Sequence, residues 1–232
     1  MEKSTANSYQ LSIRIDSDGF SLSVFDQSDS LLSTKRINVT LHTLSLPEFL
    51  TLINSETQLN FNKARIILES DSYVIIPLAL FKVEEAADFL FLEHKPAQTD
   101  SILFNKIPEL GIVNIFAVPG IVHEAISQLF PNTAIEQHIS YFITENIKSK
   151  SEHTVYCWTR NKRLDIIVFK DAKLHLINSF TYQTSEDFAY FVLNVYDKLE
   201  LDMHKYPLIL LNDREKPELR EILEKYLTVN NK

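Results

Sequence analysis

The chain has 232 residues, of which 45% are hydrophobic, so it can form a core within one large domain or two small ones. Its formal net charge of −8 disfavours a general nucleic-acid binder and a protein that docks on an anionic membrane surface, because both need clustered Lys and Arg. Its one cysteine, Cys157, excludes an intramolecular disulfide framework and fits a reducing compartment.

The first half opens with a pattern of strands, then a helix, then a further strand. Apolar and polar side chains alternate along the first segment, which is typical of a half-buried strand. Ser45 precedes the helical pattern and Glu48 follows three residues later, so a capping box is predicted. The predicted elements are strands over 9–15, 20–24 and 31–39, a helix with the apolar stripe Leu46, Phe49, Leu50 and Ile53, and a buried strand over 64–68.

Further elements are predicted before the second half begins. They are a strand over 73–76, a helix over 83–92, a hairpin of strands 101–106 and 112–118, a helix introduced by Pro119 and Gly120, a strand over 134–137 and a helix over 139–147. The polar run over 148–153 is the predicted domain boundary. It divides a first lobe with an inserted α/β subdomain, 1–150, from a shorter second lobe, 151–232.

The second half repeats the order of the first. Its predicted elements are strands over 154–158, 164–169 and 174–180, a helix capped by Thr184 or Ser185, a strand over 207–211, and a helix that begins at Pro217 and turns Leu219, Ile222, Leu223 and Tyr226 inward. Matching elements lie roughly 140–145 residues apart, whereas a solenoid repeats every ~20–50 residues. The spacing therefore indicates a duplicated fold. Chance recurrence is the alternative, since the two halves share little sequence identity.

Glycine is scarce in this chain. Only Gly19, Gly111 and Gly120 are present, whereas an average usage of about 7% would predict roughly sixteen. Glycine allows a backbone to approach a phosphate closely, which is why phosphate-binding loops are rich in it. Neither G-x-G-x-x-G nor G-x-x-x-x-G-K-[ST] can be written in this sequence.

Two segments resemble motifs of the actin-like ATPase superfamily. Pro207-Leu208-Ile209-Leu210-Leu211-Asn212-Asp213, followed by the helix that Pro217 opens, resembles the adenosine motif. Ile13-Arg14-Ile15-Asp16 and the turn after it resemble the first phosphate hairpin. The order of elements resembles the same superfamily: an α/β, duplicated actin-like and ribonuclease H-like fold, whose two lobes each have a three-stranded meander followed by helix-strand-helix. More narrowly, the chain resembles an uncharacterised bacterial family of this fold, distantly similar to PilM and the cytoplasmic domain of GspL, assembly proteins of pilus and type II secretion machines.

The resemblance implies ATP and Mg²⁺ held by two glycine-containing hairpins, and the sequence departs from that pattern. Gly19 is the only glycine of the first hairpin, and the second, 158–163, contains none. At the adenosine motif, side chains replace the superfamily's glycine pair. Seven residues are the candidate remnants of a cofactor-binding cleft: Asp16, Asp18, Gly19, Arg160, Lys162, Asn212 and Asp213.

These departures predict a degenerate actin-like fold without intact phosphate loops. The expected function is that of a non-catalytic protein-interaction or scaffold protein, with no catalytic residue, no metal and no cofactor. Its partner would be another protein or a second copy, and neither nucleic-acid binding nor membrane insertion is expected. One alternative is an ATP-binding protein of this fold that acts in an assembly or secretion-type complex, and an unrelated enzyme is another. Residues 1–10 are polar and lack a signal-peptide pattern, which predicts a cytoplasmic location.

Four smaller patterns each allow more than one interpretation. Three aspartates, Asp16, Asp18 and Asp26, are either a metal site or, as is commoner for Asp, turn residues. Cys157 is expected to be buried rather than nucleophilic. The basic cluster is a solvated hairpin tip, a docking patch for an acidic partner or a remnant of a nucleotide site; it comprises Arg160, Lys162 and Arg163, with Lys148 and Lys150. Tyr190 and Phe91 fall off the apolar faces of their helices and are interface candidates.

Overall fold

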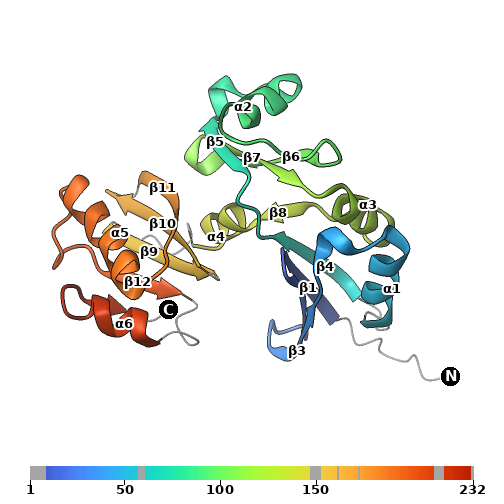
Figure 1. Ribbon diagram of the computed structural model, residues 1–232, viewed down its shortest axis with the longest axis horizontal. Coiled ribbons are helices and arrows are strands. Elements are labelled where there is room, and N and C mark those ends of the chain that lie inside the picture. Colours follow the sequence, from blue (N-terminus) through green and yellow to red (C-terminus); the bar gives the residue numbers. More distant parts are fainter. Residues whose placement is uncertain are drawn as a thin grey trace. The chain divides into compact units, whose positions relative to one another are not determined.

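Two five-stranded sheets with the same strand order organise the protein (Figure 1). The computed structural model describes residues 9–56, 61–146, 153–160, 162–171, 173–211 and 217–230. By its internal contacts the chain splits into two units, Met1–Asn146 and Ile147–Lys232, each with one of these sheets and its own apolar core. Most of the polar run predicted as the domain boundary, residues 148–152, lies outside the described residues.

The first sheet has the order β3-β2-β1-β4-β8. Its strands are β1 (Tyr9–Asp16), β2 (Gly19–Phe25), β3 (Leu31–Asn38), β4 (Phe61–Leu68) and β8 (Ile135–Gln137). Strands β1 to β3 form an antiparallel meander, whereas β4 lies parallel to both β1 and β8. The meander predicted from alternating side chains is confirmed, and the buried strand predicted over 64–68 is the second half of β4.

Alternate residues of β1 point into the first core, as the period of a strand requires. Leu11, Ile13 and Ile15 are buried there with Phe49 and Ile53 of α1 (Leu46–Glu56) and with α3 (Gly120–Leu129). At the start of α1, the Glu48 carboxylate accepts hydrogen bonds from the Ser45 amide, at 2.8 Å, and from the Ser45 hydroxyl, at 2.6 Å. The glutamate half of the predicted capping box is therefore present.

A three-stranded sheet is inserted between β4 and α3. Its order is β5-β7-β6, formed by β5 (Tyr73–Pro77), β6 (Ser101–Ile107) and β7 (Ile112–Val118), and α2 (Ala86–Glu93) packs on it. The central strand β7 is buried on both faces: Val113, Ile115 and Ala117 pack with α2, while Phe116 and Val118 join the first core. Helix α4 (His138–Asn146) follows β8 and completes the unit. The hairpin and the short helices predicted for this region are confirmed.

The second unit repeats the plan of the first. Its sheet has the order β11-β10-β9-β12-β13, formed by β9 (His153–Arg160), β10 (Arg163–Lys170), β11 (Lys173–Thr181), β12 (Leu208–Leu211) and β13 (Val229–Asn230). Strands β9 to β11 are antiparallel, and β9, β12 and β13 are parallel, as in the first sheet. The predicted duplication of a three-stranded meander followed by helix-strand-helix is confirmed.

Two helices cover the core of this unit, α5 (Ser185–Lys198) and α6 (Pro217–Leu223). Thr184 rather than Ser185 is the cap of α5. The inward orientation predicted for Tyr226 is wrong: α6 ends at Leu223, and Tyr226 is 57% exposed. None of the helices in the described ranges is long and apolar enough to cross a membrane.

Candidate functional site

Three parallel strands of the first sheet end at the same edge. Asp16 is the last residue of β1, Glu69 follows β4, and Gln137 ends β8. In open α/β sheets, ligands bind beyond the carboxyl ends of the strands. This edge is therefore the candidate site of the first unit.

The Asp16 carboxylate is paired with an arginine of the same sheet. Nη1 of Arg36, on β3, donates to Oδ2 at 2.6 Å, and Nη2 donates to Oδ1 at 2.8 Å. Oδ1 also accepts the backbone N–H of Asp18 at 2.9 Å, as in an Asx turn. The hydrogen bonds to Asp16 raise the pKa of Arg36. Asp16 thus combines the role of a turn residue with that of an ion-pair partner.

Gly19 closes the β1–β2 hairpin, where it is the register partner of Asp16. Its φ is +137°, and a Cβ atom built on it would lie 2.0 Å from the backbone oxygen of Ile37 on β3. The backbone oxygen of Asp18 accepts the N–H of Val39 at 3.0 Å, so the turn itself is bonded to the end of β3. The lack of a side chain at Gly19 is therefore required by the neighbouring strand.

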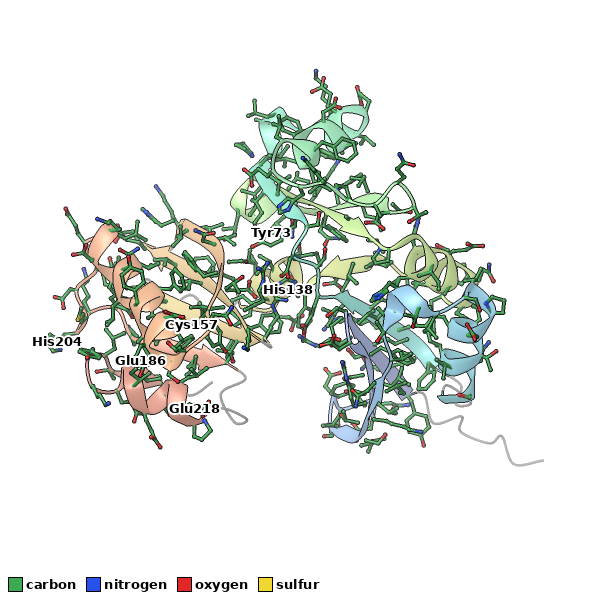
Figure 2. The ribbon with its side chains drawn as sticks, viewed as in Figure 1. Tyr73, His138, Cys157, Glu186, His204 and Glu218 are labelled. Carbon is green, nitrogen blue, oxygen red and sulfur yellow. The ribbon has the colours of Figure 1, made fainter. Side chains whose placement is uncertain are left out.

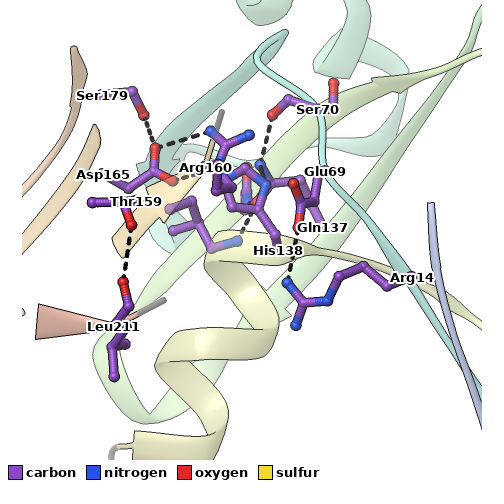
Figure 3. A network of polar contacts seen from close by, with 12 residues as sticks. Arg14, Glu69, Ser70, Gln137, His138, Thr159, Arg160, Asp165, Ser179 and Leu211 are labelled. Carbon is purple, nitrogen blue, oxygen red and sulfur yellow. Dashed lines mark hydrogen bonds and ion pairs between the residues drawn. The ribbon is translucent and has the colours of Figure 1, made fainter. Parts of the chain in front are cut away.

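Glu69 and Gln137 are held in polar contacts that sequence reasoning did not identify (Figure 3). Nη1 of Arg14 donates to Glu69 at 2.9 Å, in a pair whose side chains are 29% and 13% exposed. Nε2 of the Gln137 side chain donates to the Ser70 backbone oxygen at 2.9 Å and to Nδ1 of His138 at 2.8 Å. Gln137 is completely buried, and these hydrogen bonds hold its side chain in place at the edge of the sheet.

Arg160 occupies the matching position in the second unit, at the end of β9, and it is buried. Its Nε donates to Oδ2 of Asp165 on β10 at 2.6 Å, and its Nη2 donates to Oδ1 at 3.1 Å (Figure 3). Ser179 donates to the same Oδ1 at 2.6 Å. The side chains of the ion pair are 7% and 0% exposed. For Arg160 the expectation of a solvated hairpin tip is therefore wrong, because its guanidinium is held by a buried carboxylate.

The remaining candidates of the second unit are less enclosed. Lys162 lies in the β9–β10 turn and is exposed, and its Nζ donates to Oε1 of Gln183 at 3.3 Å. Arg163 donates from Nη1 to the Thr181 hydroxyl at 2.6 Å. Asn212 and Asp213 lie outside the described residues, as do Lys148 and Lys150. Of the predicted site residues, the structure places Asp16, Asp18 and Gly19 in one hairpin and Arg160 and Lys162 in the other.

The three aspartates considered for a metal do not gather at one place. Asp26 follows β2 at the end opposite to the turn of Asp16 and Asp18. Its Oδ1 accepts the backbone N–H groups of Ser28, at 2.8 Å, and Ser30, at 3.0 Å. Hydrogen bonding, first of all from the Ser28 side chain, lowers the pKa of Asp26. Within the described residues, no group of three or more His, Cys, Asp or Glu could hold a metal ion.

Cys157 lies inside the second core, at the middle of β9 (Figure 2). Burial raises the pKa of its thiol well above the ordinary value, and the charge of Asp165 adds to this effect. The thiolate required for nucleophilic chemistry is therefore strongly disfavoured. The prediction of a buried cysteine is confirmed.

The sequence did not reveal Arg36 and Asp165, which neutralise the charges of Asp16 and Arg160 in the two hairpins. Asp165 left a signal, because it interrupts the apolar residues Leu164, Ile166 and Ile167 of a buried strand. A charge in such a position needs a partner of opposite sign. Arg36 left none, since it lies among polar residues of an exposed edge strand.

Comparison with known proteins places the chain among proteins of this architecture. Residues 1–229 match a family model described as "Protein of unknown function (DUF3822)", and no curated protein matches the sequence. A crystal structure from Bacteroides thetaiotaomicron, described as a protein with actin-like ATPase fold and unknown function, is 24% identical. It superposes with a TM-score of 0.80 over 100% of this chain and 93% of that chain. This similarity shows the actin-like ATPase fold.

Two other solved structures are more distant. The ethanolamine utilization protein EutJ from Carboxydothermus hydrogenoformans is 8% identical, with a TM-score of 0.49 over 95% of this chain and 84% of that chain. A chain of the PilM–PilN type IV pilus biogenesis complex is 10% identical, with a TM-score of 0.48 over 97% of this chain and 88% of that chain.

Proposed function

Because the chain belongs to the family described as "Protein of unknown function (DUF3822)" and has an actin-like ATPase fold, we propose that it is a non-catalytic protein-interaction or scaffold protein built on that fold. One observation carries the proposal. The charged residue that ends the first strand of each unit is already paired inside its own unit, Asp16 with Arg36 and Arg160 with Asp165.

In the first unit, the pairing occupies the oxygens that a metal would need. A carboxylate binds Mg²⁺ through its oxygen lone pairs, and both oxygens of Asp16 accept from the Arg36 guanidinium. Bidentate arginine–carboxylate pairs are among the stronger hydrogen-bonded contacts in proteins. A magnesium ion at this carboxylate would have to displace Arg36, or bind beside its positive charge.

In the second unit, the ion pair with Asp165 holds Arg160, the cation that a phosphate group would otherwise attract. Arg160 would have to leave a pair whose side chains are 7% and 0% exposed. Breaking a buried pair by removing one partner costs about 3–5 kcal/mol, because the other charge stays buried without compensation. Recruitment of Arg160 by a phosphate group would meet a cost of this order.

Exposed aromatic side chains support the interaction half of the proposal. Tyr190 on α5 is 63% exposed and Phe91 on α2 is 56% exposed, as expected for the two interface candidates. Aromatic residues are enriched at protein interfaces, where they bury a large area at low entropic cost. A protein partner or a second copy would cover such positions.

Nucleotide binding by the same fold is the second candidate. The position of Asp16, Glu69 and Gln137 at the carboxyl edge of the parallel strands favours it. Asp16 and Asp18 would then face the magnesium ion at the first hairpin. The two candidates differ in whether Mg-ATP stabilises the folded chain.

Thermal unfolding with and without millimolar Mg-ATP separates them. A ligand at 100 times its Kd stabilises the folded state by about 2.7 kcal/mol, which raises Tm by several degrees. We expect no shift for the natural chain. A shift that Asp16→Asn removes and Asp26→Asn, the matched turn aspartate, retains would contradict the proposal and establish nucleotide binding at the first hairpin.

A further inference from the structure

Helix α2 is apolar over most of its circumference, although only one side of it is packed. Six of its eight residues, in the sequence AADFLFLE, are Ala, Leu or Phe. Ala86 and Leu90 are buried against the inserted sheet, at 6% and 0% exposure. A helix that is hydrophobic on all sides is normally buried on all sides. Here Phe91 and Leu92 are instead 56% and 81% exposed.

Two more apolar side chains are exposed just before this helix. Leu80 and Val83, in the two short 3-10 turns that precede α2, are 58% and 59% exposed. These side chains and those of Phe91 and Leu92 form what we call the α2 patch. Four of the nine exposed large hydrophobic side chains in the described ranges thus fall within residues 80–92. Figure 1 shows α2 at the top of the inserted subdomain. Such a concentration marks an interaction surface.

Acidic side chains accompany the α2 patch. Glu84, Asp88 and Glu93 are exposed in the same segment. The same segment has two lysines: Lys82, whose Nζ lies 2.6 Å from Oε1 of Glu85, and the exposed Lys95. With four acidic side chains against two lysines over residues 82–95, this segment is net negative, and a partner's cations would complement it.

We propose that the α2 patch docks a basic amphipathic segment of another protein. The apolar side of that segment would cover Phe91 and Leu92, and its Lys or Arg side chains would reach Glu84 and Asp88. This inference rests on the proposed interaction function and names the surface and the partner's chemistry. A second copy fits less well, because a symmetric contact would bring the acidic surroundings of two patches together on chains of net charge −8.

The probe is a synthetic amphipathic helical peptide with leucine on one face and lysine on the other, labelled for fluorescence anisotropy with the full chain. A matched peptide carries glutamate in place of lysine. The double variant Phe91→Ser and Leu92→Ser should weaken binding of the leucine–lysine peptide by about tenfold or more, because it removes two large apolar contacts. Tyr226→Ser, at an aromatic of the second unit that is 57% exposed and lies outside the proposed interface positions, is the matched control and should leave binding unchanged.

A second variant tests the proposed charge complementarity between the acidic side chains and the lysines of the peptide. The leucine–glutamate peptide should bind about tenfold more weakly than the leucine–lysine peptide, and Glu84→Gln with Asp88→Asn should reduce that difference. Because all four substituted side chains are exposed, the variants should unfold at nearly the same temperature as the natural chain. Equal binding of the two peptides would overturn the proposed chemistry.

Three further outcomes would overturn the proposed surface. They are no binding of either peptide, binding that the Phe91 and Leu92 substitutions do not weaken, and a dimer in sedimentation equilibrium that those substitutions dissociate. Because no nucleotide is present, these failures are distinct from failure of the proposed function. Stabilisation by Mg-ATP would contradict the non-catalytic role and leave peptide docking on the α2 patch standing.

Discussion

At the scale of single residues, Gly19 and Gly111 both have positive φ but differ in their surroundings. Gly19 has φ +137° and no room for a Cβ atom, which would lie 2.0 Å from the Ile37 oxygen. Gly111, in the β6–β7 turn, has φ +65° and open space around it. A residue with a side chain would be strained at both positions, but only at Gly19 would its Cβ atom also collide with β3.

Substitution by alanine should separate these two effects. Gly111→Ala should cost about 1 kcal/mol of unfolding free energy, the usual cost of a left-handed conformation for a residue with a side chain. Gly19→Ala should cost about 3 kcal/mol or more, because β3 must also move. Urea unfolding of both variants measures the difference. Equal losses would mean that the β2–β3 contact yields easily and that Gly19 is not required for close packing.

Arg160 and Asp165 are the buried charges on which the second hairpin depends. Arg160→Met should lower the unfolding free energy by about 3–5 kcal/mol, because Asp165 stays buried without the guanidinium. Lys82→Met breaks an exposed pair, whose side chains are 61% and 41% exposed, and should change it by less than about 1 kcal/mol. Urea unfolding at neutral pH compares them. If the two losses were similar, the Arg160 pair would not restrain the hairpin.

At the scale of elements, the start of α5 depends on a reciprocal cap. The Asp187 amide donates to Oγ1 of Thr184 at 3.1 Å, and Oδ2 of Asp187 accepts the Thr184 amide at 3.2 Å. Thr184→Ala should therefore cost about 1 kcal/mol. Ser185→Ala, at the other candidate cap position, should stay within about 0.5 kcal/mol. Equilibrium unfolding measures both, and a larger loss at Ser185 would reassign the cap.

The short strand β8 shows how a side chain can complete a sheet edge. Nδ2 of Asn105, on β6, donates to the backbone oxygen of Ile135 at 3.0 Å, and Oδ1 of Asn105 accepts the backbone N–H of Gln137 at 2.8 Å. The amide of Asn105 therefore bonds to β8 as a neighbouring strand would. Asn114 on β7 adds bonds from Nδ2 to Gln137, at 2.8 Å, and to Ser140, at 2.9 Å. These contacts attach the inserted sheet to the main sheet.

At the scale of the whole molecule, each unit applies the same plan with opposite charges. The first strand of one sheet ends in Asp16, and the first strand of the other ends in Arg160. Both residues precede a two-residue turn, and each is paired with a residue of opposite charge on another strand of its sheet. The duplicated backbone is retained while the chemistry of its two hairpins differs.

Much of this fold could be predicted because its signals are local. The alternation in β1 and the apolar stripe of α1 each arise within a few residues, and both are reflected in the observed burial. Tyr226 shows where a local pattern fails. It continues the spacing of Leu219 and Leu223, but the helix ends at Leu223 and leaves Tyr226 exposed. The last residue of a helix is poorly defined by the spacing of its apolar residues alone.

The duplicated order of elements and the places where two hairpins turn could be read from the amino-acid sequence alone, because hydrophobic period and turn residues act over short stretches of chain. The chemistry open to those hairpins depended on the folded arrangement. Pairing of β3 with β2 places Arg36 beside Asp16, and pairing of β10 with β9 places Asp165 beside Arg160. A charge is free or neutralised according to its neighbours in space, and those neighbours are set by the register in which the strands pair.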